Sequence, residues 1–214
     1  MKYTHIFWDF NGTILDDVQC GIDSVNVLLK RRGKKLIESM EEYHGVFGFP
    51  IVDYYKKLGF DFDREPYDDI AIEWVKEYNA RCPYCSACPG VTEALDAFDA
   101  YGAKQIILTA SEKSMVNNQL DGLGLRHRFE KILACDNIHA YGKTDIALDF
   151  MQKERPQKAV LIGDTEHDHD VAVKMGIDSV LVAAGHLPYS KLILCPCPVF
   201  YTLDEAVKYI TDVR

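Results

Sequence analysis

The sequence contains no long hydrophobic run. No apolar stretch approaches the roughly 20 residues that a membrane-spanning helix needs, so we expect no membrane insertion. It also has no excess of positive charge, because 24 Lys and Arg stand against 33 Asp and Glu and the formal net charge is −9. Nucleic acids and anionic membrane surfaces are bound through basic patches, so this balance argues against both kinds of partner.

A secretory signal pattern is missing as well, because the first residues lead directly into a short apolar run. The seven cysteines are an odd number, and we therefore expect reduced thiols and a cytoplasmic protein. Three of them, Cys82, Cys85 and Cys88, are spaced like metal ligands. Three thiolates need a fourth ligand to complete a usual site, so we interpret this run as a reduced connector without a metal.

Hydrophobic periodicity predicts the class of fold. Short apolar runs that are typical of buried strands alternate with helical patterns, which indicates a parallel α/β sheet flanked by helices. The expected strands cover residues 5–8, 104–109, 131–134, 159–164 and 178–182, and the expected helices include 18–32, 91–101, 144–153 and 203–210. Residues 17–80 show helical spacing without strand alternation, which predicts an all-helical insertion after the first strand.

Polar side chains follow the expected strands where these end. Asp9, Thr109 and Asp164 occupy such positions, and Asp168 comes four residues after Asp164. The carboxyl ends of parallel strands are where open α/β sheets bind ligands. Three carboxylates in one crevice repel each other unless a hard cation neutralises them, and Mg²⁺ with its preference for oxygen ligands fits. Lys143 precedes a helix and can bring a positive charge to a phosphate. Thr109, with the backbone N–H groups of the next helix start, can bind phosphate oxygens.

Four motifs in this order make the chain resemble the haloacid dehalogenase superfamily, in particular its phosphoglycolate-phosphatase-like members with a helical cap. The first motif of that family matches Asp9-Phe10-Asn11-Gly12-Thr13, the second Thr109, the third Lys143 and the fourth Gly163 to Asp168. The resemblance implies a Rossmann-like core formed by residues 1–16 and 87–214, with the cap at residues 17–86.

The resemblance also implies roles for individual residues. Asp9 would attack phosphorus and form an aspartyl-phosphate, while Thr109 and Lys143 would hold the phosphoryl oxygens. Mg²⁺ would be held by Asp9, the backbone carbonyl of Asn11 and Asp164, with Asp168 helping directly or through water. The candidate substrate-binding residues are Gly12, Thr13, Ala110, Phe47 and Phe49. The segment from Phe47 to Pro50 is either a helix break or part of a specificity surface.

Asn11 departs from the family pattern, which has an aspartate there as general acid and base. An amide can neither protonate a leaving oxygen nor take a proton from water. General acid–base catalysis typically contributes about 10²–10⁴-fold, so we expect a slowed enzyme rather than an inactive one. The expected function is a Mg²⁺-dependent phosphatase for a small phosphorylated metabolite, active as a monomer or homodimer. The alternatives are a phosphomutase of the same superfamily and a phosphate-binding or regulatory protein without turnover.

Overall fold

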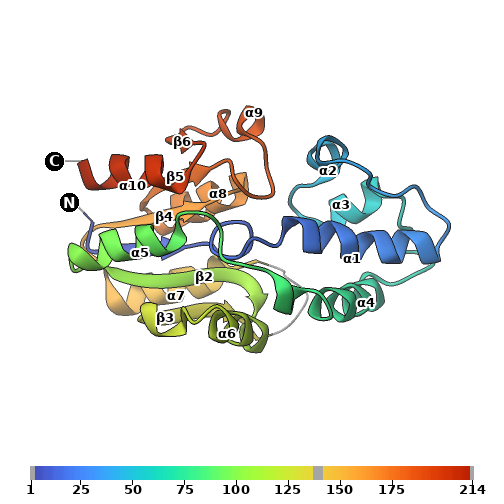
Figure 1. Ribbon diagram of the computed structural model, residues 1–214, viewed down its shortest axis with the longest axis horizontal. Helices are drawn as coiled ribbons and strands as arrows, with labels where there is room; N and C mark the ends of the chain where they lie inside the picture. The colour runs from blue at the N-terminus through green and yellow to red at the C-terminus, as the bar shows by residue number, and fades with distance from the viewer. Residues whose placement is uncertain (1–2, 137–141, 213–214) are drawn as a thin grey trace. The chain divides into compact units, whose positions relative to one another are not determined.

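The computed structural model describes residues 3–136 and 142–212, and the chain forms two compact units. The first unit comprises Met1–Asp16 and Ser86–Arg214, and the second comprises Asp17–Cys85. Figure 1 shows the course of the chain. The elements of the first unit are β1 (His5–Trp8), α5 (Val91–Ala100), β2 (Lys104–Glu112), α6 (Lys113–Gly122), β3 (Lys131–Cys135), α7 (Thr144–Glu154), β4 (Ala159–Gly163), α8 (Glu166–Met175), β5 (Asp178–Val182), α9 (Tyr189–Leu192), β6 (Val199–Phe200) and α10 (Leu203–Asp212), with a 3₁₀ turn at Arg126–Arg128.

A parallel sheet forms the centre of the first unit. In the described residues it has six strands in the order β3-β2-β1-β4-β5-β6, and every neighbouring pair is parallel. In β1, Phe7 lies opposite Ile106 of β2 and Leu161 of β4. Strands that are covered on both faces are apolar throughout rather than alternating, as β1 and β4 are here. The expected α/β class with a parallel sheet is confirmed.

Helices cover both faces of the sheet. Helices α6, α7 and α8 pack on one face, and α5 and α10 pack on the other. Side chains of β1 alternate between these layers: the Phe7 ring meets Phe150 of α7 edge-on at 5.5 Å, and Trp8 meets Phe98 of α5 at 5.7 Å. The indole N–H of Trp8 donates to Gln105 Oε1 at 3.1 Å, which satisfies the polar atom inside this core. These contacts hold β1 within the core, and the polar residues that follow the strand begin where this packing ends.

The expectation that Thr109 ends its strand is wrong. Strand β2 continues to Glu112, and its pairing with β3 shifts register between Leu108 and Glu112. Regular pairing thus stops just before Thr109, and the irregular stretch bends the strand over the following residues. Strand β6 was not expected from the sequence, because two residues are too few to show any periodicity.

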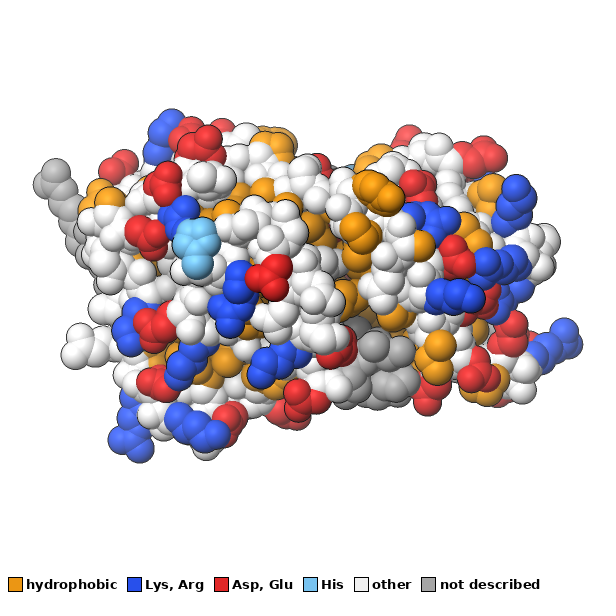
Figure 2. Space-filling view, turned by 60° about the horizontal axis from the view of Figure 1, so that its bottom comes forward, with side chains coloured by type: hydrophobic (Ala, Val, Ile, Leu, Met, Phe, Trp, Pro, Cys, Tyr) orange, Lys and Arg blue, Asp and Glu red, His pale blue; other side chains and the backbone are white. Residues whose placement is uncertain are grey.

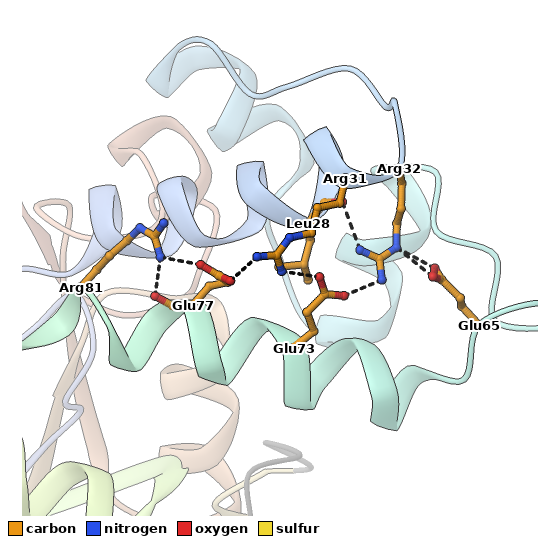
Figure 3. Close-up of polar contacts among 7 residues, drawn as sticks. All are labelled: Leu28, Arg31, Arg32, Glu65, Glu73, Glu77 and Arg81. Carbon is orange, nitrogen blue, oxygen red and sulfur yellow. Dashed lines mark hydrogen bonds and ion pairs between the residues drawn. The ribbon is translucent and has the colours of Figure 1, made fainter.

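The second unit is entirely helical. Its elements are α1 (Val18–Arg31), α2 (Met40–Val46), α3 (Ile51–Lys57), α4 (Tyr67–Asn79) and a 3₁₀ turn, η1, at Cys82–Tyr84. The Tyr78 hydroxyl of α4 donates to Asp17 Oδ2 at 2.6 Å, just ahead of α1. Charged side chains also join α1 to α4, as Figure 3 shows. Arg32 donates to Glu73 at 2.6 Å and to Glu65 at 2.7 and 2.9 Å.

The surface carries charges of both signs. Figure 2 shows Lys and Arg side chains lying among Asp and Glu side chains on the face drawn. Neither sign of charge dominates the face drawn. Within the described residues, no helix is both long and apolar enough to cross a membrane.

Candidate active site

Three carboxylates meet at the carboxyl ends of β1 and β4. The backbone N–H of Asp9 donates to Ile162 O at 2.9 Å, which extends the ladder by one residue beyond β1. Asp164 directly follows the last residue of β4, and Asp168 lies in the first turn of α8. Asp9, Asp164 and Asp168 each bring a carboxylate oxygen within 4.8 Å of the others. The residues that the sequence placed in one crevice are therefore brought together.

Lys143 lies among these carboxylates. Its Nζ atom contacts Asp9 Oδ1, donates to Asp168 Oδ1 at 2.5 Å and donates to the carbonyl oxygen of Leu108 at 3.1 Å. The residue is 1% exposed and precedes α7, so the chain places a buried ammonium group against the sheet edge. A buried charge is tolerated only when it is paired, and here every donor direction is used.

The charges of this cluster do not balance. Burial and the charge of Asp168 raise the pKa of Asp9 to about 8, although Lys143 lowers it. Burial would also raise the pKa of Asp168, but the charge and hydrogen bond of Lys143 bring it below the ordinary value. For Lys143, burial lowers the pKa, but Asp168 and Asp9 outweigh this effect and raise it. Asp9 therefore tends to keep its proton at neutral pH while no cation is bound. With all three carboxylates ionised, the cluster would carry two excess negative charges, which a divalent cation would neutralise.

The carboxylates differ in how many lone pairs remain for a metal. Asp168 Oδ2 accepts from Thr165 Oγ1 at 2.8 Å and from the N–H groups of Thr165 and Asp164 at 3.0 and 3.2 Å, and its Oδ1 accepts from Lys143. Asp168 thereby closes the capping box that begins α8. Asp164 Oδ1 accepts from the Thr13 hydroxyl over 3.4 Å. Both oxygens of Asp168 are thus engaged by hydrogen bonds within the protein, which makes it less suited to ligate a metal directly.

Two glycines allow the backbone to approach Asp164. Gly12 has φ +75°, and a Cβ atom there would lie 2.3 Å from Asp164 Oδ2. A Cβ atom at Gly185 would lie 2.1 Å from the same oxygen and 2.5 Å from the carbonyl oxygen of Gly12. The N–H of the next residue, His186, donates to Asp164 Oδ2 at 2.6 Å. Only glycine leaves room for this arrangement, which orients the carboxylate through the backbone.

Asn11 is held by a serine from the next strand. Ser111 Oγ donates to Asn11 Oδ1 at 2.6 Å, and the Ser111 N–H donates to Thr109 Oγ1 at 3.1 Å. Thr109 is 2% exposed, and Ser111 links it to Asn11 through these two hydrogen bonds. The Glu112 side chain caps α6 by accepting from the backbone N–H groups of Ser114 and Met115. Thr109 and Lys143 remain the candidate phosphate-binding side chains.

A comparison with models of protein families identifies the family of this chain. The model of the haloacid dehalogenase-like hydrolases matches residues 6–182. The chain belongs to this family. Membership confirms the family resemblance that the sequence indicated.

Named proteins and solved structures share the fold of this hydrolase. Tyrosine-protein kinase PtkA of Mycobacterium tuberculosis is 24% identical over 185 residues, which are 85% of this chain and 62% of that protein. The chain thus spans less than two thirds of that relative's length. A phosphoglycolate phosphatase of Caulobacter vibrioides is 24% identical over 188 residues, covering 85% of this chain and 79% of that protein. A haloacid dehalogenase-like hydrolase from Streptococcus pneumoniae superposes with a TM-score of 0.84 at 20% identity, covering 97% of this chain and 98% of that one.

The remaining candidate residues lie in different units of the chain. Thr13 and Ala110 lie beside Asp164 and Thr109, in the first unit. Phe47 and Phe49 lie in the helical unit, where Phe47 packs with its ring centroid 4.9 Å from that of Tyr43 and 6.0 Å from that of Phe49. Phe47 is therefore part of an aromatic cluster that holds α2 and α3 together.

Sequence reasoning missed three residues that shape the site of this hydrolase. Ser111, Gly185 and His186 contact the predicted residues directly. Gly185 and His186 follow β5, so their position after a strand end was a usable signal. Nothing in the local pattern marked Ser111, whose partner is 100 residues away in the chain.

Proposed function

We propose that this hydrolase is a Mg²⁺-dependent phosphatase that cleaves a small phosphorylated metabolite through an aspartyl-phosphate on Asp9. The observation that carries the proposal is the buried Lys143, which contacts Asp9 and Asp168 at the edge of the sheet. A cation at this point can bind phosphoryl oxygens, and its charge favours the ionised form of Asp9. The phosphatase named in Caulobacter vibrioides supports the same class of reaction.

The donor set fits Mg²⁺. Asp9, Asp164 and the backbone carbonyl of Asn11 would hold the ion, and Asp168 would contribute through water because its oxygens are already engaged. The bound ion would neutralise the two excess negative charges and stabilise charge on the phosphoryl oxygens.

Each residue of the site has its own role in the proposed reaction. Asp9 is the nucleophile, with its orientation fixed by Lys143 and by the ladder bond to Ile162. Thr109 and Lys143 donate hydrogen bonds to the transferred phosphoryl group, since positioning and charge stabilisation dominate this chemistry. Asn11 supplies a polar contact but no proton. Slow hydrolysis of the aspartyl-phosphate follows, and a phosphomutase, which depends on the same proton transfers, is less well supported.

The helical unit is proposed to act as a cap that selects the substrate. Its aromatic cluster around Phe47 offers apolar side chains, and the Phe47–Phe49 pair lies in the loop between α2 and α3. The cytoplasmic location and the monomeric or dimeric state remain predictions from the sequence.

Steady release of inorganic phosphate tests the proposal. The protein with Mg²⁺ should release phosphate from an activated aryl phosphate over many turnovers, and excess chelator should stop it. Asp9→Ala should remove the activity, whereas Asp149→Ala at an exposed helix position should keep it. Undiminished turnover in Asp9→Ala would refute the assignment. Phosphate binding without turnover would instead identify a binding or regulatory protein.

A further inference from the structure

The amide of Asn11 is held in one orientation. Its Oδ1 atom accepts a hydrogen bond of 2.6 Å from Ser111 Oγ, and the Ser111 N–H donates to Thr109 Oγ1 at 3.1 Å. Because the amide group is planar and its oxygen faces Ser111, the Nδ2 atom points away from Ser111. An amide nitrogen donates hydrogen bonds but does not act as an acid in water. Asn11 therefore offers a hydrogen-bond donor and no proton that a leaving group could take.

The backbone that carries Asn11 is fixed as well. Asn11 and Leu15 form a bridge, and the Gly12 N–H donates to Leu15 O at 2.9 Å, so this segment folds into a tight turn. The Asp16 N–H donates to Ser86 O at 2.9 Å, which anchors the end of the segment. Side chain and backbone together keep the amide at the position where the family pattern has an acid.

Two other side chains near this turn are possible sources of a proton. Lys143 Nζ already contacts two carboxylates and donates to Leu108 O at 3.1 Å, so giving a proton to a leaving group would break these contacts. His186 lies against the turn, because a Cβ atom on Gly12 would come within 2.7 Å of its Cδ2 atom. A proton from His186 would make alkyl esters good substrates, whereas without one the site is restricted to leaving groups that need no proton.

The basicity of the leaving oxygen decides whether it needs a proton. When the bond between phosphorus and that oxygen breaks, the oxygen keeps the electron pair. A carboxylic acid has a pKa of about 4, whereas water, which alcohols resemble, has a pKa of about 15.7. A carboxylate therefore departs unprotonated, and an alkoxide does not. In addition, attack of Asp9 on an acyl phosphate exchanges one carboxylic–phosphoric anhydride for another, so the aspartyl-phosphate forms without a large change in free energy.

The charge of the site distinguishes between the leaving groups that need no proton. In the part of the chain that the structure describes, the cluster contains three carboxylates and one cation, Lys143. The phosphate that leaves from a phosphoanhydride carries roughly 1.5 to 2 negative charges near neutral pH, whereas a carboxylate carries one. The carboxylate meets less repulsion from Asp9 and Asp164, so the site favours an acyl phosphate over a phosphoanhydride.

We propose that the substrates of this hydrolase are small acyl phosphates, an inference that rests on the proposed phosphatase function. The Asp9 carboxylate attacks phosphorus, the bond from phosphorus to the acyl oxygen breaks, and a carboxylate leaves with the electron pair while Asn11 Nδ2 donates to its oxygen. Water then attacks the phosphorus of the aspartyl-phosphate and loses a proton to solvent, which releases phosphate and restores Asp9. A free carboxylate attacks without losing a proton, so it competes with water and forms an acyl phosphate again.

Isotope exchange tests the departure of a carboxylate. The full-length protein with Mg²⁺ is incubated with acetyl phosphate and an excess of isotopically labelled acetate, and NMR follows the label. We expect label to enter acetyl phosphate, at the same rate in the control Asp149→Ala, whose side chain is exposed, and not in Asp9→Ala or without protein. Release of phosphate from an activated aryl phosphate without any exchange would refute this inference and leave the proposed function standing. Loss of both activities would refute the proposed function itself.

A matched pair of substrates gives the second measurement. Acetyl phosphate and ethyl phosphate are similar in size, but one releases a carboxylate and the other an alkoxide. The ratio of their kcat/KM values should fall by about 10²–10⁴-fold in Asn11→Asp, because the new carboxyl group helps only the alkoxide to leave. Both substrates are measured on the same preparation, so partial misfolding of the variant does not change the ratio. An unchanged ratio, which a proton from His186 would produce, or faster cleavage of pyrophosphate than of acetyl phosphate would overturn the proposal.

Discussion

Replacing Asn11 with aspartate tests how this site handles protons. Asn11 Oδ1 accepts a hydrogen bond of 2.6 Å from Ser111 Oγ, so an isosteric carboxylate would keep the same partner and orientation. A carboxyl group at this position can protonate a leaving oxygen and then take a proton from water. We expect Asn11→Asp to hydrolyse an alkyl phosphate about 10²–10⁴ times faster than the parent protein, a change of about 3–5 kcal/mol in the barrier.

Ser111 determines how much of this gain is realised. A hydrogen bond to a charged group contributes about 1.5–3 kcal/mol, against about 0.5–1.5 kcal/mol for a neutral pair. Ser111→Ala should therefore cost more in the Asn11→Asp protein than in the parent, by roughly tenfold in rate. The difference between the two backgrounds measures the coupling of the two side chains and separates positioning from a general loss of stability.

The assay compares two leaving groups. The leaving group of an activated aryl phosphate departs without a proton. Formation of the aspartyl-phosphate from it should therefore gain less from Asn11→Asp than formation from an alkyl phosphate. Asn11 precedes glycine and can deamidate, so intact and peptide mass spectrometry must accompany every rate. An unchanged rate on alkyl phosphates in deamidation-free Asn11→Asp protein would refute the reasoning, because another base would then serve the site.

Three further predictions concern other parts of the molecule. Lys143→Met leaves Asp9 and Asp168 without their buried counter-ion, so it should abolish turnover and destabilise the protein by about 3–5 kcal/mol in denaturant unfolding. Glu73→Gln should cost about 1 kcal/mol near neutral pH through its partly buried pair with Arg32. Burial raises the pKa of Glu73 but its arginine partners lower it overall, so the cost should vanish as pH falls below the ordinary glutamate pKa of about 4.3. Phe49→Ala should change substrate preference more than it changes hydrolysis of a very small phosphate ester.

Matched variants serve as controls for these predictions. Lys153→Met removes a lysine whose side chain is 70% exposed, and it should change neither stability nor turnover by much. Asp53→Asn removes an exposed partner of Lys56 and should change the stability little. Phe62→Ala removes a ring elsewhere in the helical unit. Equal losses on every substrate in Phe49→Ala would indicate structural damage rather than altered specificity.

Periodicity was sufficient to predict five of the six described strands of the sheet and the carboxylates that lie at its edge. Asp9 and Asp164 could be placed together because both follow buried parallel strands, a relationship that depends only on local pattern and general topology. The extent of β2 could not be predicted, because a register shift beyond Leu108 depends on how β3 pairs with it. The sequence pattern gives no information on such pairing.

Side-chain contacts between distant segments were the other limit. The hydrogen bond from Ser111 to Asn11 joins residues that are 100 positions apart in the chain. Packing in three dimensions decides such partners, whereas spacing within one segment does not.

The hydrogen bond between Asp16 and Ser86 has a consequence for protein engineering and for evolution. The Asp16 nitrogen lies 2.9 Å from the Ser86 oxygen. The chain segments on either side of the helical unit therefore already run side by side, like the two strands of a hairpin. A short turn could join them without a change in the path of the sheet, and a segment of another length or fold could start and end at the same two points. Residues 17–85 thus occupy a position where whole modules can be exchanged while the residues that carry the chemistry stay on the sheet.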